Sequence, residues 1–266
     1  MLPAIRPAGA MIAIISDIHG NLEALEAVLS RVDSDYAVYC AGDVVGYGPD
    51  PNACCDLLRE RGVACVMGNH DFVCANLDRM DSGNDDWPEE QRELCRRIYN
   101  DKNSVAKASS RWTNSVLTEE NKRFLRELPL KLEVEGLTIV HGRPGSPEQM
   151  LNEYVMPGQG TAALAEQTGG RMLVVGHSHL PMRTAQVINP GSVGQPRDRN
   201  WMASFATLDP VRFKFRYIQD EDMSFRIVSK VVNIQRVPYD IGKTIQKIKD
   251  EPELPDTLGE RLTVGL

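Results

Sequence analysis

Short apolar runs without polar interruption recur along this chain, and they restrict its fold more than any other feature of the sequence. Three such runs cover residues 11–16, 36–41 and 63–67. After the first run, Asn21 is predicted to open an amphipathic helix, because leucines then recur at helical spacing. Strands that are apolar throughout are buried on both faces, as in parallel sheets covered by helices. The first part of the chain therefore predicts a layered α/β fold.

The rest of the chain divides into a charged helical segment and a second group of strands. Residues 72–130 are rich in charge and are predicted to form a helical insertion. Strands are predicted again at 131–134, 137–140, 172–175, 185–188 and 204–208, a hairpin at 213–218 and 225–232, and helices at 161–167 and 241–248. We expect a flexible arm at residues 1–10, a single domain at 11–250 and a tail at 251–266, and whether Met11 is the true start stays open.

Composition and charge argue against several classes of function. The chain has 30 Lys and Arg residues against 37 Asp and Glu residues, a net charge of −7, whereas a binder of duplex nucleic acid needs a basic surface. Neither a membrane span of about 18 apolar residues nor a secretory signal is recognisable in the sequence. The six cysteines form no C-x-x-C pair, so we expect buried thiols in a reducing cytoplasm. The oligomeric state stays open, a homo-oligomer included.

All the histidines follow closely after predicted strands. They are His19, His70, His141, His177 and His179. Asp17, Asp43 and Asn69 occupy similar places, and in α/β sheets the carboxyl ends of the strands converge on the ligand crevice. Imidazole and carboxylate together are typical ligands of Mn, Fe, Zn or Ni, and this many donors suits two divalent transition-metal ions that share a carboxylate. The alternative is a set of unrelated turn histidines.

These blocks resemble the signature of calcineurin-like metallophosphoesterases. In the order of that family they are Asp17-Ile18-His19, Gly42-Asp43, Gly68-Asn69-His70-Asp71, His141-Gly142 and Gly176-His177-Ser178-His179. The resemblance implies a four-layer α-β-β-α sandwich, in which two mixed sheets are flanked by helices. The metal ligands that it implies are Asp17, His19 and His179 for one ion, Asn69, His141 and His177 for the other, and Asp43 as the bridge between them.

The same resemblance implies a hydrolytic mechanism. Two cations would neutralise the oxygens of a phosphate ester and lower the pKa of a bridging water, whose hydroxide attacks in line. Asp43 would then be both ligand and catalytic residue, and His70 would donate a proton or a hydrogen bond at the phosphate. A turn histidine that only orders its loop is the alternative for His70. Protein Ser/Thr phosphatases of the superfamily have Asp-Arg in place of Gly46-Tyr47, which disfavours a phosphoprotein substrate and leaves the adjacent Asp71 as a candidate to orient His70.

The substrate expected from the resemblance is a small phosphodiester, a phosphomonoester or a dinucleoside polyphosphate. Residues 46–51 and 189–194 are similar to a prokaryotic subgroup of small phosphodiesterases and diadenosine tetraphosphatases, although ordinary turns have the same glycine and proline content. Two other functions stay open: a non-catalytic metal-binding scaffold on the same fold, and a single-strand nuclease.

Several cationic and aromatic residues are candidates for contacts with this substrate. Arg143 and Arg197 could each bind a second phosphate, unless they are solvated loop arginines. Tyr47 could stack on a nucleobase. Trp87, Tyr99 and Trp112 could do the same from a lid formed by the insertion, although aromatic residues on helices more often belong to a core.

Overall fold

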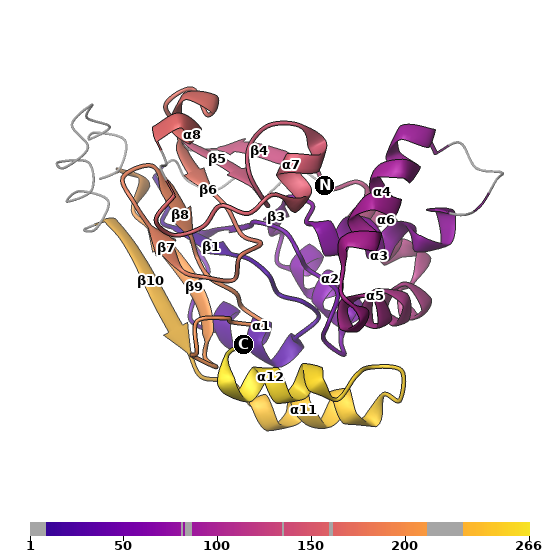
Figure 1. Ribbon diagram of the computed structural model, residues 1–266. Helices are drawn as coiled ribbons and strands as arrows, with labels where there is room; N and C mark the ends of the chain where they lie inside the picture. The colour runs from indigo at the N-terminus through magenta and orange to yellow at the C-terminus, as the bar shows by residue number, and fades with distance from the viewer. Residues whose placement is uncertain (1–8, 81, 83–86, 135, 160–161, 212–230) are drawn as a thin grey trace.

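Two five-stranded sheets form the centre of the molecule (Figure 1). The computed structural model describes residues 9–80, 82, 87–134, 136–159, 162–211 and 231–266. The first sheet contains, in order of pairing, β10 (Val232–Val237), β9 (Ala203–Leu208), β1 (Ile12–Ile15), β2 (Ala37–Cys40) and β3 (Ala64–Cys65). The second contains β4 (Lys131–Val134), β5 (Leu137–Val140), β6 (Met172–Val174), β8 (Val187–Asn189) and β7 (Met182–Arg183).

Both sheets are mixed, as the predicted fold class requires. In the first sheet β1, β2 and β3 run parallel, and β9 pairs antiparallel with β1. In the second sheet β5, β6 and β8 run parallel, and β4 and β7 pair antiparallel at its two edges. The parallel strands are those that the unbroken apolar runs predict.

The two sheets share an apolar layer. Ile12 and Ile14 of β1 belong to it, together with Ile139 of β5 and Val174 of β6. Ile15, on the opposite face of β1, belongs to another apolar layer that includes residues of α1 (Leu22–Leu29) and α2 (Pro51–Glu60). Because both faces of β1 are covered, the strand consists of apolar residues alone.

Helices lie on the outer faces of the sheets (Figure 1). α1 begins after Asn21, whose side chain accepts a hydrogen bond from Ala24 N at 3.1 Å, so the predicted start of this helix is confirmed. α11 (Ile241–Asp250) packs against α1 and against α12 (Thr257–Val264). α8 (Ala162–Gln167) packs against β6, and α7 (Pro147–Asn152) lies between β5 and β6 in the chain. The two sheets are thus flanked by helices.

The segment predicted as a helical insertion contains most of four helices that lie together on one side of the molecule (Figure 1). They are α3 (Asn69–Met80), α4 (Glu89–Asp101), α5 (Ser104–Val116) and α6 (Glu119–Arg126). α3 contacts each of the other three. It begins at Asn69 rather than after residue 72, so Asn69 and His70 lie in the first turn of a helix.

Some elements differ from the sequence prediction, and some predicted segments lie outside the described residues. β7 was not predicted, because a two-residue edge strand carries no apolar pattern. Residues 251–266, expected as a tail, contain α12. The arm at 1–10 and the hairpin at 213–218 and 225–232 fall largely outside the described residues. All six cysteines are buried and free, as predicted. Within the described residues, no helix combines the length and hydropathy needed to cross a bilayer.

Candidate metal centre

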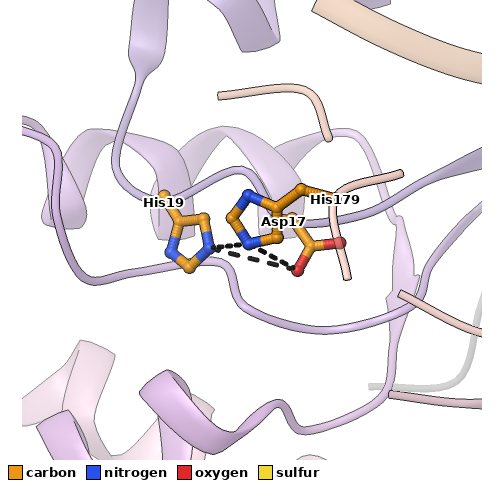
Figure 2. A group of neighbouring side chains, drawn as sticks. All are labelled: Asp17, His19 and His179. Atoms are coloured by element: carbon orange, nitrogen blue, oxygen red, sulfur yellow. Dashed lines mark hydrogen bonds and ion pairs between the residues drawn. The ribbon is translucent and has the colours of Figure 1, made fainter. Parts of the chain in front are cut away.

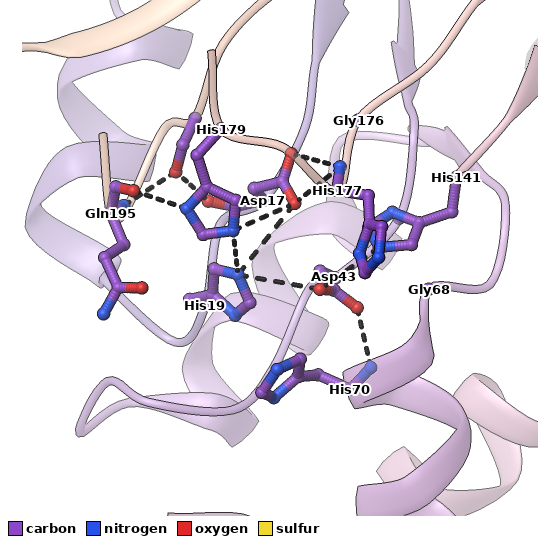
Figure 3. Close-up of polar contacts among 12 residues, drawn as sticks. Asp17, His19, Asp43, Gly68, His70, His141, Gly176, His177, His179 and Gln195 are labelled. Atoms are coloured by element: carbon purple, nitrogen blue, oxygen red, sulfur yellow. Dashed lines mark hydrogen bonds and ion pairs between the residues drawn. The ribbon is translucent and has the colours of Figure 1, made fainter. Parts of the chain in front are cut away.

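The predicted site residues lie together, each shortly after a strand (Figure 3). After the first-sheet strands come Asp17, His19, Asp43, Asn69 and His70, and after those of the second come His141, His177 and His179. All eight side chains are buried, with at most 5% of the residue surface exposed. These residues converge because the strands that precede them run parallel, so that the carboxyl ends of the strands lie close together.

One group of converging ligand atoms comes from Asp17, His19 and His179 (Figure 2). Nε2 of His179 lies 3.0 Å from Nε2 of His19 and 3.4 Å from Oδ1 of Asp17. The distance between His19 Nε2 and Asp17 Oδ1 is 4.0 Å. Two imidazole nitrogens and a carboxylate oxygen at these separations can all be ligands of one divalent transition-metal ion.

A second group comes from Asp43, His141 and His177, with Asn69 beside it. Nε2 of His141 lies 3.3 Å from Oδ2 of Asp43. The amide atom of Asn69 that faces the group lies 3.2 Å from each of these two atoms and 3.3 Å from His177 Nδ1. If that atom is nitrogen, its two hydrogens face three acceptors; if it is oxygen, four acceptors face one another and need a cation between them. The second orientation is the one in which Asn69 acts as a ligand.

Asp43 lies between the two groups. Its Oδ2 atom is 3.6 Å from Nε2 of His19 in one group and 3.3 Å from Nε2 of His141 in the other. Its Oδ1 atom accepts a hydrogen bond from the backbone N–H of His70 at 2.8 Å. A carboxylate in this position can contact two neighbouring ions, which is the role that the sequence predicts for it.

The outward ring nitrogens of the four candidate ligand histidines each face a backbone carbonyl. Nδ1 lies 3.2 Å from Val45 O in His19, 2.8 Å from Ala41 O in His141 and 2.5 Å from Gln195 O in His179. In His177 it is Nε2 that faces a carbonyl, that of Asn152, at 3.3 Å. A neutral imidazole that donates to a carbonyl from its outer nitrogen presents a lone pair on the inner one. These hydrogen bonds thus orient the four histidines so that each could present a lone pair to a metal ion.

The backbone at the ligands is strained. Asp17, His19, Asp43, His177 and His179 all have positive φ angles between 50° and 64°. Residues other than glycine seldom adopt this left-handed conformation, which costs of order 1–3 kcal/mol each and tends to cluster at functional sites. Gly68 and Gly176 make room around the same carboxylates, because a Cβ atom at either position would collide with Asp43 or Asp17.

Without a cation, burial and neighbouring charges shift the pKa values of the candidate ligands in opposing directions. Burial raises the pKa of Asp17 to about 7 and lowers that of His19 to about 3. Burial also acts to lower the pKa of His141, but the Asp43 carboxylate outweighs it and raises that pKa to about 9. In the buried site, these carboxylates and imidazoles cannot all keep the charge that they prefer in water. Bound cations would remove this conflict, so the residues present fit a metal centre.

His70 lies beside the two groups rather than within them. Its ring centroid is 5.0 Å from that of His19 and 4.5 Å from that of Tyr47, and burial lowers its pKa. The carboxylate of Asp71 accepts hydrogen bonds from Val45 N at 3.1 Å and Gly68 N at 3.0 Å. Asp71 therefore supports the loops that carry the ligands, and within the described residues His70 Nδ1 has no hydrogen-bond partner.

The centre opens into a cavity of about 320 Å³. Tyr47 and Arg197, two of the candidates for contacts with substrate, line this cavity. Arg143 is not among the lining residues, and it pairs with Glu153 at 3.6 Å on the surface. Of the aromatic residues considered for a lid, Trp87 and Trp112 are buried in apolar clusters between helices. The structure thus brings Tyr47 and Arg197 to the centre but not Arg143 or these two tryptophans.

Three further lining residues were missed by the sequence analysis. The Tyr154 ring stacks on His177, with centroids 4.0 Å apart, and Tyr154 is 49% exposed. Lys102 follows α4, and Arg261 belongs to α12. None of these three belongs to a motif, and only the packing of α4, α7 and α12 around the sheets places them at the cavity.

Comparisons with known proteins agree with this geometry. A family model described as the calcineurin-like phosphoesterase superfamily domain matches residues 11–211. An uncharacterised protein of Methanocaldococcus jannaschii is 34% identical over 96% of this chain and 98% of its own. A crystal structure of a metallophosphoesterase from Sphaerobacter thermophilus is 30% identical, with a TM-score of 0.68 over 97% of this chain and 99% of that one. A hypothetical protein of Pyrococcus horikoshii, 23% identical, shares the fold with a TM-score of 0.75 over 97% of this chain and 99% of its own.

Proposed function

Because the chain belongs to the calcineurin-like phosphoesterase superfamily, it is a phosphoester hydrolase, and we propose that it works with two divalent transition-metal ions. The observation that carries this proposal is the position of Asp43 between two groups of ligand atoms, each completed by two histidines. One group would be Asp17, His19 and His179, the other Asn69, His141 and His177. The complete ligand set disfavours a non-catalytic scaffold. Mn, Fe, Zn and Ni all suit these donors.

The residues of the chain would divide the catalytic work. Two bound cations would neutralise the phosphoryl oxygens and lower the pKa of the attacking water. Asp43 lies between the two ligand groups. Its carboxylate also accepts a hydrogen bond of 2.8 Å from the backbone N–H of His70. His70 is then placed to donate a proton or a hydrogen bond to the phosphate. Its ring lies against Tyr47, which lines the same cavity.

The substrate class is a small phosphorylated compound. We expect a phosphodiester, a phosphomonoester or a dinucleoside polyphosphate, with Arg197 and Tyr47 in contact with it, since both line the cavity next to the ligands. Tyr154 adds an exposed aromatic face on which a nucleobase could stack. A cytoplasmic location is proposed because six free, buried thiols suit a reducing compartment.

The decisive experiment combines metal analysis with turnover. We expect purified protein loaded with manganese to contain two ions per chain and to hydrolyse bis-p-nitrophenyl phosphate. Asp43→Asn should reduce this rate by at least about 10³-fold while the protein stays folded, because the bridging carboxylate is lost. Asp56→Asn, a change of an exposed carboxylate on α2 that pairs with Arg59, is the matched control. Full activity of Asp43→Asn, or full activity of a chain carrying a single ion, would contradict the two-metal proposal.

A further inference from the structure

Three basic side chains from separate parts of the chain line the cavity at the metal centre. Lys102 follows α4, Arg197 lies between β8 and β9, and Arg261 belongs to α12. In the part of the chain that the structure describes, no carboxylate forms an ion pair with any of them. The lining carboxylate side chains are Asp43, which belongs to the candidate metal centre, and the exposed Asp101, and Leu266, the last residue of the sequence, also lines the cavity. On a chain with a net charge of −7, this cavity is therefore a local concentration of positive charge.

Lys102 is held against a candidate metal ligand. Its Nζ atom lies 2.9 Å from the outer amide atom of Asn69. When the Asn69 oxygen points to a metal ion, the amide nitrogen points to Lys102, and one donor cannot bond another. In the metal-bound orientation the ammonium group therefore needs a different acceptor, and the cavity that it lines is where one can bind.

The two arginines approach the same cavity from the side of Tyr47. The Arg197 guanidinium lies over the Tyr47 ring, 5.9 Å from its centroid, and donates one hydrogen bond of 3.0 Å to Gln195 Oε1. Arg261 lines the same cavity as Tyr47 and Arg197. Most of the guanidinium donors of Arg197 remain available to an anion.

The charge of these residues exceeds what a single phosphoryl group requires. Two divalent ions, two ligand carboxylates, Asp17 and Asp43, and the attacking hydroxide leave a net charge of about +1, so a phosphoryl dianion bound there needs one more positive charge for balance. Three additional cations remain in the cavity beside that position. A second phosphate is the group that forked arginine donors and a lysine ammonium recognise best.

We propose that Lys102, Arg197 and Arg261 form a subsite for a second phosphate group, so that preferred substrates carry two or more linked phosphates. This proposal rests on the proposed phosphoesterase function. Hydrolysis then adds water across a P–O–P link. The water oxygen bonds to the phosphorus held at the metal centre, and the P–O bond to the bridging oxygen breaks. The bridging oxygen leaves with the second phosphate and takes up a proton.

The test compares substrates with one and with two phosphates. Manganese-loaded wild type, Lys102→Gln and Arg261→Gln are assayed on p-nitrophenyl phosphate and on ADP. In each variant we expect kcat/KM for ADP to fall about 10- to 100-fold more than kcat/KM for p-nitrophenyl phosphate, as removal of a charge-assisted hydrogen bond predicts. Lys107→Gln, a change on α5 of a lysine that bonds Asn100 O and does not line the cavity, should leave the ratio unaltered.

Binding gives a second measurement that does not depend on turnover. Calorimetry on the manganese-loaded protein compares methylenediphosphonate with inorganic phosphate, and metal analysis afterwards checks that both ions are retained. We expect wild type to bind the diphosphonate at least tenfold more tightly than phosphate, and the two variants to lose that preference. Equal losses for both ligands and both substrates, or no loss, would overturn the subsite.

The two proposals fail in different ways. A wild type that hydrolyses p-nitrophenyl phosphate, but whose preference for two phosphates is absent or insensitive to Lys102→Gln and Arg261→Gln, refutes the subsite and leaves the phosphoesterase intact. A wild type that hydrolyses no phosphate ester, yet binds the diphosphonate in a manner that depends on Lys102 and Arg261, refutes the phosphoesterase proposal and retains the anion subsite.

Discussion

At the scale of single residues, the hydrogen bonds of the outward ring nitrogens determine which nitrogen of each candidate ligand histidine faces the centre. Backbone carbonyls of Val45, Ala41 and Gln195 each face an outward Nδ1, so three imidazoles present Nε2 to the centre. His177 is turned the other way by Asn152 O and presents Nδ1. Ring orientation is therefore fixed by backbone groups, and the inner donor atoms need little rearrangement to bind an ion.

His70 has no such carbonyl, and this difference predicts its role. Burial lowers its pKa, so the imidazole is neutral and donates a hydrogen bond rather than a proton. We expect His70→Ala to lower kcat by about 10²–10³-fold, as loss of a preorganised donor to a phosphoryl oxygen does. The loss should be the same for p-nitrophenyl phosphate and for phenyl phosphate, whose leaving groups differ in their need for a proton. Metal content should stay at two ions.

A different result would reassign His70. If the loss were much larger for phenyl phosphate than for p-nitrophenyl phosphate, His70 would protonate the leaving oxygen. If the variant instead lost an ion, the main role of the His70 side chain would be to keep the segment whose backbone N–H bonds the Asp43 carboxylate in place.

The sequence predicted the donor residues of the centre but not the walls of the cavity. Asp17, His19 and Asp43 stand out because polar residues directly after buried apolar strands are rare except at sites. Lys102 and Tyr154 follow helices in charged or loop-like surroundings, where lysine and tyrosine are ordinary surface residues. Their place at the cavity depends on tertiary packing, which no local pattern encodes.

At the scale of elements, buried strands could be predicted from the local sequence, whereas short or interrupted helices could not. The residues of β1 are all apolar because both faces of the strand are covered, and β2 and β5 are apolar apart from Thr138, so the positions of these strands are readable from the sequence. α12 escaped prediction because Pro255 precedes it and Gly259 lies within it, and both residues are poor signals of a helix. α12 nevertheless contributes Leu258 and Leu262 to an apolar cluster with Tyr47. An element with weak local preference is thus stabilised by its contacts.

The attachment of α11 to α1 depends on a buried carboxylate. Glu23 of α1 accepts a hydrogen bond from Thr244 Oγ1 at 3.0 Å and pairs with Lys247 at 2.7 Å and Lys243 at 3.0 Å. Burial acts to raise the pKa of Glu23, but the bonds to Lys247 and Lys243 outweigh it, so the pKa lies below its ordinary value of 4.5. A carboxylate whose pKa is lower in the folded state stabilises the fold above its unfolded pKa, and this contribution is lost as the pH falls through its folded value.

The lowered pKa of Glu23 gives a prediction for Glu23→Gln. At pH 7 the variant should lose about 1–2 kcal/mol of unfolding free energy, because hydrogen bonds to a charged group are replaced by weaker ones. The difference from wild type should be smaller near pH 3, because the protonated fraction of Glu23 is larger there than at pH 7. Urea unfolding at the two pH values measures it. Glu26→Gln, on the exposed face of the same helix, is the control and should change stability little at either pH. A deficit of equal size at both pH values would show that the effect is not ionic.

At the scale of the whole molecule, the candidate metal centre draws its residues from both sheets. Asp17, His19 and Asp43 come from the first sheet, and His141, His177 and His179 from the second. Each proposed ion therefore has ligands from both sheets. Elsewhere the sheets meet through apolar side chains, such as Ile14 and Ile139, whose contact has no direction. The ions would add a directional link at the one edge where the site needs a fixed geometry.

Metal removal should therefore lower global stability, not only activity. An ion that binds only the folded protein, at a free concentration 100 times its Kd, adds about 2.7 kcal/mol per site. For a chain of this size that corresponds to a rise in Tm of roughly 5–10 °C for one site. We expect calorimetry to show at least this rise when manganese is restored to protein treated with a chelator.

Substitution of candidate ligands from each sheet tests whether the ions stabilise the contact between the sheets or only the site itself. His141→Ala removes a second-sheet ligand and His19→Ala a first-sheet ligand, and each should abolish most of the rise for its own site. Asp43→Asn, which weakens both groups, should lose more of the rise than either, since Asp43 contacts both. Asp56→Asn should retain it in full. If manganese bound with two ions per chain and yet left Tm unchanged, binding would not distinguish the folded chain from the unfolded one, and the two sheets would owe their association to the apolar layer alone.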